Sequence, residues 1–382
     1  MKIAWITNYQ APYREPMWRE LATIADLDVV FLFHQENVRH WTWRKAIGYR
    51  SSVLRTRQIP LPRAVARRLG EPMVILEPGA AGRLLRGADA LVVHEWWQLA
   101  YVWCALRART IGIPYLIYSE STLQSRQFRS GPAAWFRSLF FRQAGAVIVP
   151  GPAAAGAAMS NGTAPHRIVE SVNSVDLDLF GRKVAALRVG ETPCAAGHRF
   201  VYVGQLIQRK NVHSLIRAFT AADKSSSLDI AGDGAELEAL KSLAVEYGVA
   251  SRVRFHGFLP EAEVLQLLAK SHTLVLPSTE EVYGFTALEA YVAGLQVVVS
   301  ERAGVAPNLA GRRGTWIVDP TEDGLHAALR EAESRWAGWR DRVDTELASP
   351  RRAASDIVLA AQIAREPWIR APSTHRRPRG IH

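Results

Sequence analysis

Two acidic residues bracket a glycine in the stretch "EEVYGFTALE", which spans residues 280–289. The apolar run before Glu281 predicts a strand, and a helix is expected to start near Gly284, with Glu289 one to two turns inside it. An ionised carboxylate only accepts hydrogen bonds, which suits the paired hydroxyls of a sugar or a ribose. A glycine lets the backbone approach a ligand, and the amides at a helix start stabilise a diphosphate. The stretch therefore fits a nucleotide-sugar site; the alternative is a helix-start acid beside a solvated one.

A second candidate site lies in "YVGQLIQRKNV", residues 202–212. A strand is expected to end at Gly204, and a helix is expected to start near Asn211, with Lys210 just before it. Exposed N–H groups and a cation at such a point suit a phosphate. A plain turn from strand to helix is the alternative for this stretch by itself.

The elements that must position these residues form two series. Strand-length apolar runs alternate with helical patterns, which predicts parallel sheets covered by helices and a doubly wound α/β fold. The expected strands of the first series span residues 2–7, 28–33, 90–94, 114–119 and 146–150. The second series starts with a strand at 198–207 and continues with helices at 211–221, 235–247, 261–270 and 284–293.

The length of 382 residues fits two domains. Two such α/β units would face a central cleft, with the carboxyl ends of both sheets toward it. The predicted organisation is a Rossmann-like domain at 1–175, an irregular linker at 176–197, a second Rossmann-like domain at 198–350, and a C-terminal helix and basic tail at 351–382 that packs back toward the first domain.

The composition is that of an ordinary soluble protein, with 48% hydrophobic and 22% charged residues. Cys104 and Cys194 are the two cysteines and form no CxxC pair, which argues against a disulfide scaffold or a zinc finger and favours a reducing compartment. The start "MKIAWITNY" meets a polar residue too soon for a signal peptide, and no apolar run reaches the roughly 18 residues of a membrane span. The expected location is the cytoplasm, with peripheral contact at the inner face of the membrane.

The net charge of +11 is unevenly distributed. Residues 1–170 contain 21 Lys and Arg against 11 Asp and Glu, whereas residues 171–350 contain 19 against 23. A basic first half predicts an anionic partner there, such as a phosphorylated substrate or an anionic membrane surface; a solvated basic surface is the alternative. The chain has no RNP motif, zinc finger or lysine-rich tail, so nucleic acid is not an expected partner.

The stretch "LVLPSTEEVYGFTALEAYVAGLQVVVS" resembles the E-x7-E signature of retaining GT-B glycosyltransferases of family 4, the glycosyl transferases group 1. The stretches "VNSVDLDLF", "VGQLIQRKNV", "IAGDGAELEAL" and "RVRFHGFLP" match the same family in the same order, so the resemblance covers about 170–310. It implies a GT-B fold and transfer of a sugar from a nucleotide-sugar donor to a hydroxyl of a glycolipid, polysaccharide or small-metabolite acceptor, with retention of configuration.

The resemblance also implies roles for the donor-site residues. Glu281 would contact hydroxyls of the donor sugar, Glu289 would bind the ribose, and Lys210 would neutralise the diphosphate. Glu281 and Lys210 are therefore predicted catalytic residues. The amides at Gly284, Phe285 and Thr286 would hold the diphosphate and the sugar, and Gly257, Phe258 and Leu259 would border the base.

One position departs from the family. Where the family has an arginine directly after the glycine of "VG", this chain has Gln205 after Gly204. Arg209 or an arginine of the first half, Arg14 first among them, would have to replace that cation. The resemblance implies an enzyme without a metal or other cofactor, with a UDP-sugar as the most frequent donor of the family and GDP- or dTDP-sugars open.

Candidate acceptor residues follow strands of the first half. Tyr13 and Arg14 stand in "TNYQAPYREP", His94 and Trp96 stand in "VVHEWWQ", and Glu120 stands in "YSESTLQ". Glu120 is predicted to orient the acceptor hydroxyl or to act as a general base. His94 would contact the acceptor, and Trp96 would stack on an acceptor ring. A rigid turn at the proline, a structural glutamate and core His or Trp side chains are the alternatives.

Three other functions share these features. A nucleotide-sugar epimerase would release free nucleotide without an acceptor, and a pseudo-glycosyltransferase would couple rings that are not sugars. A non-catalytic sugar-nucleotide-binding protein would bind the nucleotide and never turn over, and Gln205 is the residue that keeps this alternative open.

Overall fold

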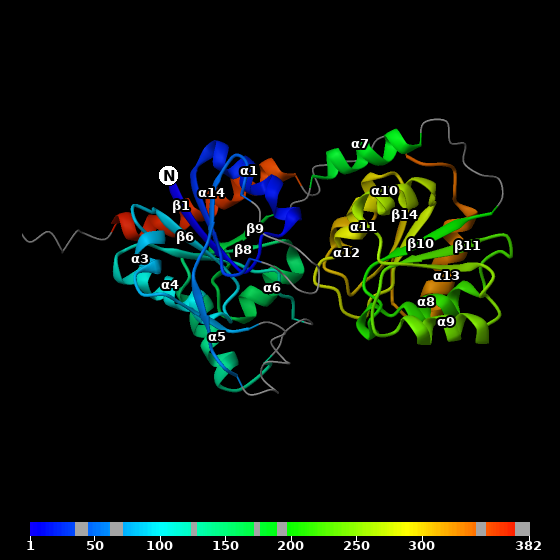
Figure 1. The fold of residues 1–382 in the computed structure, drawn as a ribbon, viewed down its shortest axis with the longest axis horizontal. Coiled ribbons are helices and arrows are strands. Elements are labelled where there is room, and N and C mark those ends of the chain that lie inside the picture. Colours follow the sequence, from blue (N-terminus) through cyan, green and yellow to red (C-terminus); the bar gives the residue numbers. More distant parts are fainter. Residues whose placement is uncertain are drawn as a thin grey trace, which may run out of the picture. The chain divides into compact units, whose positions relative to one another are not determined.

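The computed structural model describes residues 1–34, 45–61, 72–123, 128–171, 176–188, 197–340 and 349–370. The chain divides into two compact units (Figure 1). The central cleft that the sequence predicts between them remains a prediction. The first unit comprises Met1–Glu120, Arg126–Ser174 and Pro350–His382, and the second comprises Ser121–Ser125 and Val175–Ser349.

The first unit is built on a parallel sheet in the order β3-β2-β1-β6-β7-β8-β9. The chain starts in the middle of this sheet and the strand order reverses between β1 and β6, as in a doubly wound fold. A small antiparallel pair, β4 (Thr56–Gln58) and β5 (Val74–Leu76), was not expected from the sequence. The strands of the main sheet are β1 (Lys2–Thr7), β2 (Asp26–Phe31), β3 (Arg50–Val53), β6 (Ala90–His94), β7 (Tyr115–Tyr118), β8 (Ala146–Val149) and β9 (Ile168–Glu170).

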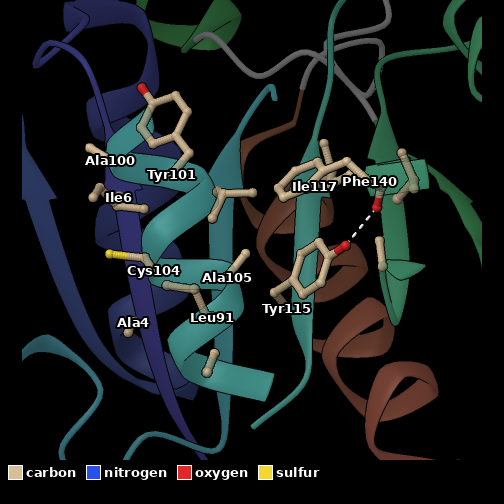
Figure 2. Close-up of a cluster of buried hydrophobic side chains, with 14 of the residues drawn as sticks. Ala4, Ile6, Leu91, Ala100, Tyr101, Cys104, Ala105, Tyr115, Ile117 and Phe140 are labelled. Carbon is tan, nitrogen blue, oxygen red and sulfur yellow. Dashed lines mark hydrogen bonds between the residues drawn. The ribbon is translucent and has the colours of Figure 1, made fainter. Parts of the chain in front are cut away.

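Helices cover both faces of this sheet. One face packs against α3 (Ala80–Leu84), α4 (Leu99–Thr110), α5 (Pro132–Gln143) and α6 (Pro152–Ser160). Figure 2 shows part of this core, where Tyr101 and Cys104 come from α4 and the Tyr115 hydroxyl donates to the Phe140 carbonyl at 2.6 Å.

The C-terminal helix α14 (Pro350–Arg370) completes the other face of the first unit. It packs against α1 (Glu15–Ile24) and over strands β6 to β9, and its inward residues are mostly alanines, which lets its backbone lie close to the sheet. A side chain at Gly145 would lie 2.6 Å from Cβ of Ala364, so glycine is required at that contact. The buried side chains of α14 are Ala353, Ala354, Ile357, Ala360, Ala361 and Ala364.

The second unit has the strand order β12-β11-β10-β13-β14-β15, again with all strands parallel. The order reverses between β10 and β13, so each unit has one reversal point. The strands are β10 (Arg199–Val203), β11 (Ser227–Ala231), β12 (Val253–Gly257), β13 (Thr273–Leu276), β14 (Gln296–Ser300) and β15 (Thr315–Val318). The helices around them are α8 (Val212–Phe219), α9 (Leu237–Glu246), α10 (Glu261–Lys270), α11 (Phe285–Val292), α12 (Ala306–Leu309) and α13 (Glu322–Ser334).

The predicted linker at 176–197 is not irregular throughout, because Leu177–Leu187 form helix α7. The Asp176 side chain caps this helix by accepting from the Leu179 amide at 2.9 Å. Leu177 and Val184 are buried where α7 packs against α10 and α11. The expectation of an irregular linker was wrong here because the apolar residues are spaced for one helix face, a pattern that the glycine and arginine content obscured.

Ala361→Asp tests the contribution of α14 to the first unit. Ala361 is fully buried against the sheet, so an aspartate there would leave an unpaired charge in the core. We expect the first unit to lose about 2–4 kcal/mol of stability. Urea unfolding followed by limited proteolysis of the first unit measures this loss. Leu359→Asp is the matched control on the exposed side of the same helix, and an equal loss in that variant would contradict the assignment.

Candidate functional site

The predicted site residues of the second unit lie where its strand order reverses. Lys210 follows β10 and Glu281 follows β13, which are neighbours in the sheet. In parallel α/β sheets this edge, at the carboxyl ends of the strands, is where ligands bind. The fold therefore brings together residues that are 71 positions apart in sequence.

Lys210 and Glu281 form an ion pair through Nζ and Oε2. Their side chains are only 12% and 11% exposed, so the pair is partly withdrawn from water. The Ser278 hydroxyl lies 3.4 Å from the same carboxylate oxygen. A cation and an anion fixed side by side can serve a ligand that carries both phosphate and hydroxyl groups.

Backbone contacts hold the loops that carry this pair. The Thr279 amide donates to the Arg209 carbonyl at 2.9 Å, and Arg209 Nη1 donates to the Glu280 carbonyl at 3.2 Å. Glu281 also forms an isolated bridge with Ala303, in the loop after β14. The ends of three neighbouring strands are thus joined, and Arg209, one of the candidate substitute cations, belongs to this network.

Asn211 is a residue of the site that sequence reasoning did not single out. It is buried and adopts a left-handed conformation with φ of 58° between the turn at Lys210 and helix α8. Its side-chain amide donates to the carbonyls of Pro277 at 3.0 Å and Pro320 at 2.7 Å. The signal in the sequence was an asparagine at the junction of strand and helix, where such residues favour positive φ.

Gly284 starts helix α11 in a conformation that excludes other residues. Its φ is 102°, and a Cβ atom there would lie 2.7 Å from Leu276. Phe285 and Thr286 are then the first residues of α11, whose amide groups have no acceptor within the helix. The helix start therefore presents backbone donors beside Glu281.

Glu289 lies on the second turn of α11 and is half-buried. Among the described residues its carboxylate has no hydrogen-bond or ion-pair partner. Burial raises the pKa of Glu289 to about 7, and the negative charge of Glu261 adds to the shift. A carboxylate kept in this setting is suited to accept hydrogen bonds from a ligand, because the protein supplies none.

Glycines bring the loops after β10 and β11 into close contact. A Cβ atom at Gly232 would collide with the Gly204 carbonyl, and one at Gly234 would collide with the Leu206 carbonyl. Half-buried Gln205, the departure from the family, uses its backbone carbonyl to accept from the Tyr202 hydroxyl at 2.8 Å.

The segment after β12 provides an apolar border to the same sheet edge. Gly257 has φ of 67° and accepts from the Gly232 amide at 2.7 Å. Phe258 follows as an exposed ring, and Leu259 is half-buried. An exposed aromatic ring beside the ends of the strands offers a stacking surface for a base.

In the first unit the structure brings Arg14, His94 and Glu120 together at the reversal of strand order. Buried Arg14 lies 2.8 Å from Nδ1 and 3.2 Å from Nε2 of His94, and it donates to Glu120 Oε1 at 2.9 Å. The Thr7 hydroxyl also lies 3.0 Å from Nδ1 of His94. We call these three residues the Arg14 cluster.

The Arg14 cluster has a fixed protonation pattern. Burial, together with the charge of Arg14, lowers the pKa of His94 to about 3, so the imidazole is neutral at pH 7. Glu95, which has φ of 67°, accepts from the Ser119 hydroxyl at 2.8 Å and from the Glu120 amide at 3.0 Å. Glu95 was missed by sequence reasoning, and it positions the backbone that carries Glu120.

Tyr13 and Trp96 differ in their relation to this cluster. Tyr13 precedes Arg14 in a 3-10 turn, with its ring 5.1 Å from the guanidinium. Trp96 instead contacts Phe128, Phe136 and the guanidinium of Arg137 at the side of the core. The structure therefore does not bring Trp96 to the Arg14 cluster, and its role in acceptor binding stays a prediction.

A cavity of about 530 Å³ opens at the same sheet edge of the first unit. Tyr9 and Phe33 stack with ring centroids 5.1 Å apart on one side of it. Arg55, Gln58 and Glu77 supply polar groups to its lining. Aromatic rings beside planar polar side chains form a surface that suits a saccharide. The sequence analysis did not single out any of these residues.

Solved structures share this architecture along nearly the whole chain. The structure of Anabaena HepE in complex with UDP matches with a TM-score of 0.67 and 19% identity, covering 95% of this chain and 95% of that one. The apo form of the lipopolysaccharide outer core galactosyltransferase WaaB matches with a TM-score of 0.68 and 17% identity, covering 94% of this chain and 99% of that one. At such identities the likeness concerns the fold, and the predicted GT-B class is confirmed.

Residues 197–345, most of the second unit, match the family model described as glycosyl transferases group 1. The chain is 30% identical over 229 residues to a glycogen synthase of Mycobacterium tuberculosis, covering 53% of this chain and 55% of that protein. It is 31% identical over 153 residues to the lipopolysaccharide core biosynthesis glycosyltransferase LpsE of Rhizobium meliloti, covering 40% and 42%. The chain thus spans about half of the length of these relatives.

Asn211→Gly separates the positive φ of Asn211 from the hydrogen bonds of its side chain. Glycine keeps the positive φ but removes both side-chain hydrogen bonds and leaves the Pro277 and Pro320 carbonyls without that donor. We expect a loss of about 1–3 kcal/mol in the stability of the second unit, measured by urea unfolding. The control is Asn308→Gly on the short helix α12, because the Asn308 side chain makes no such link between described strands. If Asn211→Gly is as stable as the parent protein, the role assigned to Asn211 is wrong.

Glu289→Gln should change how stability depends on pH. Because the folded-state pKa is about 7 and the ordinary value is 4.5, the carboxylate destabilises the fold progressively as pH rises from 4.5 to 7. The neutral glutamine removes that penalty, so the variant should exceed the parent by about 1–3 kcal/mol at pH 8 and by little at pH 4.5. Thermal unfolding at both pH values measures the difference. The exposed Glu263→Gln is the control, and a gain of equal size at both pH values would refute the explanation.

Proposed function

We propose that the protein is a retaining, metal-independent glycosyltransferase of family 4, a hexosyltransferase that moves a sugar from a nucleotide sugar to an acceptor hydroxyl. The observation that carries the proposal is the Lys210–Glu281 pair beside the start of α11, at the reversal of strand order. The family match of residues 197–345 supports it, since that match covers the unit that holds the pair.

The donor is proposed to bind to the second unit. Its diphosphate would lie at the amides of Gly284, Phe285 and Thr286, and its ribose hydroxyls would donate to Glu289. The base would stack near Phe258, which is exposed at the same sheet edge. The partial positive charge of the helix start and the charge of Lys210 would balance the diphosphate without a metal ion.

Lys210 and Glu281 are proposed to exchange partners when the donor binds. The two side chains contact each other in this structure, so a diphosphate would compete with Glu281 for Nζ of Lys210. Glu281 would then accept hydrogen bonds from hydroxyls of the donor sugar. The exchange leaves Lys210 paired with an anion and the Glu281 carboxylate hydrogen-bonded, which limits the free energy needed to desolvate the two charges. Arg209, in the same loop, is the proposed replacement for the cation missing at Gln205.

In the proposed chemical step the leaving group is the nucleoside diphosphate, which is already negatively charged. The bond between the anomeric carbon and the diphosphate oxygen breaks, and the acceptor oxygen bonds to the same face of the sugar. The acceptor proton passes to the departing diphosphate oxygen, so no protein nucleophile takes part. The protein would contribute by positioning both substrates and stabilising the charge that develops on the diphosphate.

The acceptor is proposed to bind to the first unit. Glu120 is held by Arg14 and by the Glu95 network, so its carboxylate has a fixed position from which to orient an acceptor hydroxyl. His94 would contact the acceptor as a neutral imidazole. The cavity beside Tyr9 and Phe33 would accept a saccharide ring, which favours a glycolipid or glycan acceptor. The proposed place of action is the cytoplasm, where nucleotide sugars would be available.

Nucleotide binding and transfer can be tested separately in matched variants. Isothermal titration with UDP, GDP and dTDP should show binding, with UDP the expected ligand. Lys210→Ala should weaken diphosphate binding about 10- to 100-fold, because a charged hydrogen bond is lost. Glu281→Gln should keep nucleotide binding but lower sugar transfer by about 100-fold or more. Lys241→Ala and Glu280→Gln serve as controls, since one lies on α9 and the other next to Glu281 in sequence.

The products then distinguish the alternatives. Transfer with retained configuration at the anomeric carbon, seen by NMR, supports the proposal. Inverted configuration would refute the retaining mechanism. Release of free nucleotide and an epimerised sugar without acceptor would identify an epimerase, and binding without turnover on any acceptor would identify a non-catalytic protein.

A further inference from the structure

Helix α4 carries large apolar side chains on its outer face as well as on its inner face. Its inner face, with Ala100, Tyr101 and Cys104, packs in the core that Figure 2 shows. Its outer face carries Trp103, which is 60% exposed, and Leu106, which is 51% exposed. A surface helix of a globular protein ordinarily places polar residues on its outer face. The outer face of α4 is therefore suited to contact something other than water.

Helix α5 repeats this arrangement on the same face of the sheet. Trp135 is 68% exposed, and Leu139, one turn further along, is also exposed. Both helices pack against the same hydrophobic cluster, and Arg109 at the end of α4 donates to Gln143 at the end of α5. Two indole rings and two leucines thus lie on one side of the first unit. We call the outer surface of α4 and α5 the α4–α5 face.

Positive charge accompanies these apolar residues. Helices α4 and α5 carry three exposed arginines, and neither helix contains an acidic residue. Arg107 and Arg109 stand in the last turn of α4, and Arg142 stands in the last turn of α5. The opposite face of the sheet differs, because its helices α1 and α14 carry acidic as well as basic residues. The excess of charge therefore belongs to the α4–α5 face.

A pocket of about 370 Å³ lies between α5 and α6 at the border of this face. Its described lining includes no carboxylate. Arg137 is buried there and is fixed by Asn161, which accepts from its Nε at 3.0 Å. The other polar residues of the lining include Arg129, Arg142, Ser138 and Ser160. Several guanidinium groups with hydroxyls and an amide form a site suited to a phosphate-bearing headgroup.

We propose that the α4–α5 face docks on the headgroup layer of a membrane that contains anionic lipid. Tryptophan favours the boundary between water and hydrocarbon, and arginine is attracted to anionic headgroups. Leu106 and Leu139 would enter the upper acyl region, and the α5–α6 pocket would hold one phosphate headgroup. In the described part of the chain no helix is long and apolar enough to cross a membrane, so the protein would lie on the surface.

Vesicle co-sedimentation of the full chain tests this proposal. The protein should bind vesicles of phosphatidylcholine with phosphatidylglycerol about tenfold or more tightly than vesicles of phosphatidylcholine alone, and added salt should weaken the binding. Changing Arg107, Arg109, Arg129 and Arg142 to glutamine should abolish the preference for anionic vesicles. Trp103→Gln combined with Trp135→Gln should weaken binding to both vesicle types and remove fluorescence quenching by bromine-labelled lipid.

Exposed apolar residues outside the α4–α5 face provide the matched control. Ile24→Gln combined with Val245→Gln changes two such residues, on α1 and α9, and should leave vesicle binding unchanged. Because all substituted side chains are exposed, retained UDP binding and an unchanged melting temperature show that each variant is folded.

Three results would overturn the proposal. The first is no binding to anionic vesicles by the parent protein. The second is binding that the tryptophan and arginine variants leave intact. The third is duplex DNA that displaces the vesicles and binds with the same sensitivity to these variants, which would identify a nucleic-acid surface instead. None of these results depends on glycosyl transfer, so the test is independent of the proposed enzyme activity.

Discussion

A buried amide joins the strand ends on which the second unit's site depends. Asn211 donates to the carbonyls of Pro277 and Pro320, which follow β13 and β15, while Asn211 itself follows β10. Lys210 precedes this residue directly, so its position is set by the same tie. A short polar side chain in a left-handed conformation can do this because it reaches carbonyls that no regular strand partner satisfies. The loops that carry Lys210 and Glu281 therefore form one hydrogen-bonded network.

The site holds its charges at a cost in folding free energy. Glu289 is half-buried, has no hydrogen-bond or ion-pair partner in the part of the chain that the structure describes, and is repelled by Glu261. An ionised carboxylate in this position is unfavourable until a ligand supplies hydrogen-bond donors, which supports the proposal that Glu289 contacts a ligand. In the Arg14 cluster, the cost of burying a charge is reduced in another way. There the buried guanidinium is balanced by Glu120, and the neighbouring imidazole stays neutral.

In the first unit, the carboxyl edge of the sheet and its two faces carry different features. The carboxyl edge carries the Arg14 cluster and the cavity beside Tyr9, one face is closed by α14, and the other carries the α4–α5 face. Closure by α14 depends on alanines and on Gly145, which allow the close approach of backbone to sheet. An extended C-terminal helix is thereby an integral part of a domain that begins some 350 residues earlier.

The architecture and the main site were largely predictable from the sequence. Mostly apolar runs such as 2–7 and 90–94 are long enough only for strands buried on both faces, and the alternation with helices then predicts a doubly wound sheet. The stretch that contains Glu281, Gly284 and Glu289 was predicted to follow a strand and to start a helix, and β13 and α11 confirm these two elements. These signals are local, because residue type, period and turn chemistry act over a few positions.

The tertiary structure decided what depends on partners far apart in the chain. The ties of Asn211 span 66 and 109 positions, and the contact between Arg14 and Glu120 spans 106. No local pattern distinguishes Glu95, which positions Glu120, from any other acid after a strand. The sequence likewise did not show that Trp96 packs beside Phe136 and Arg137. Sequence determined which segments become strands and helices, whereas packing determined which side chains meet, because hydrogen bonds and burial act through space and not along the chain.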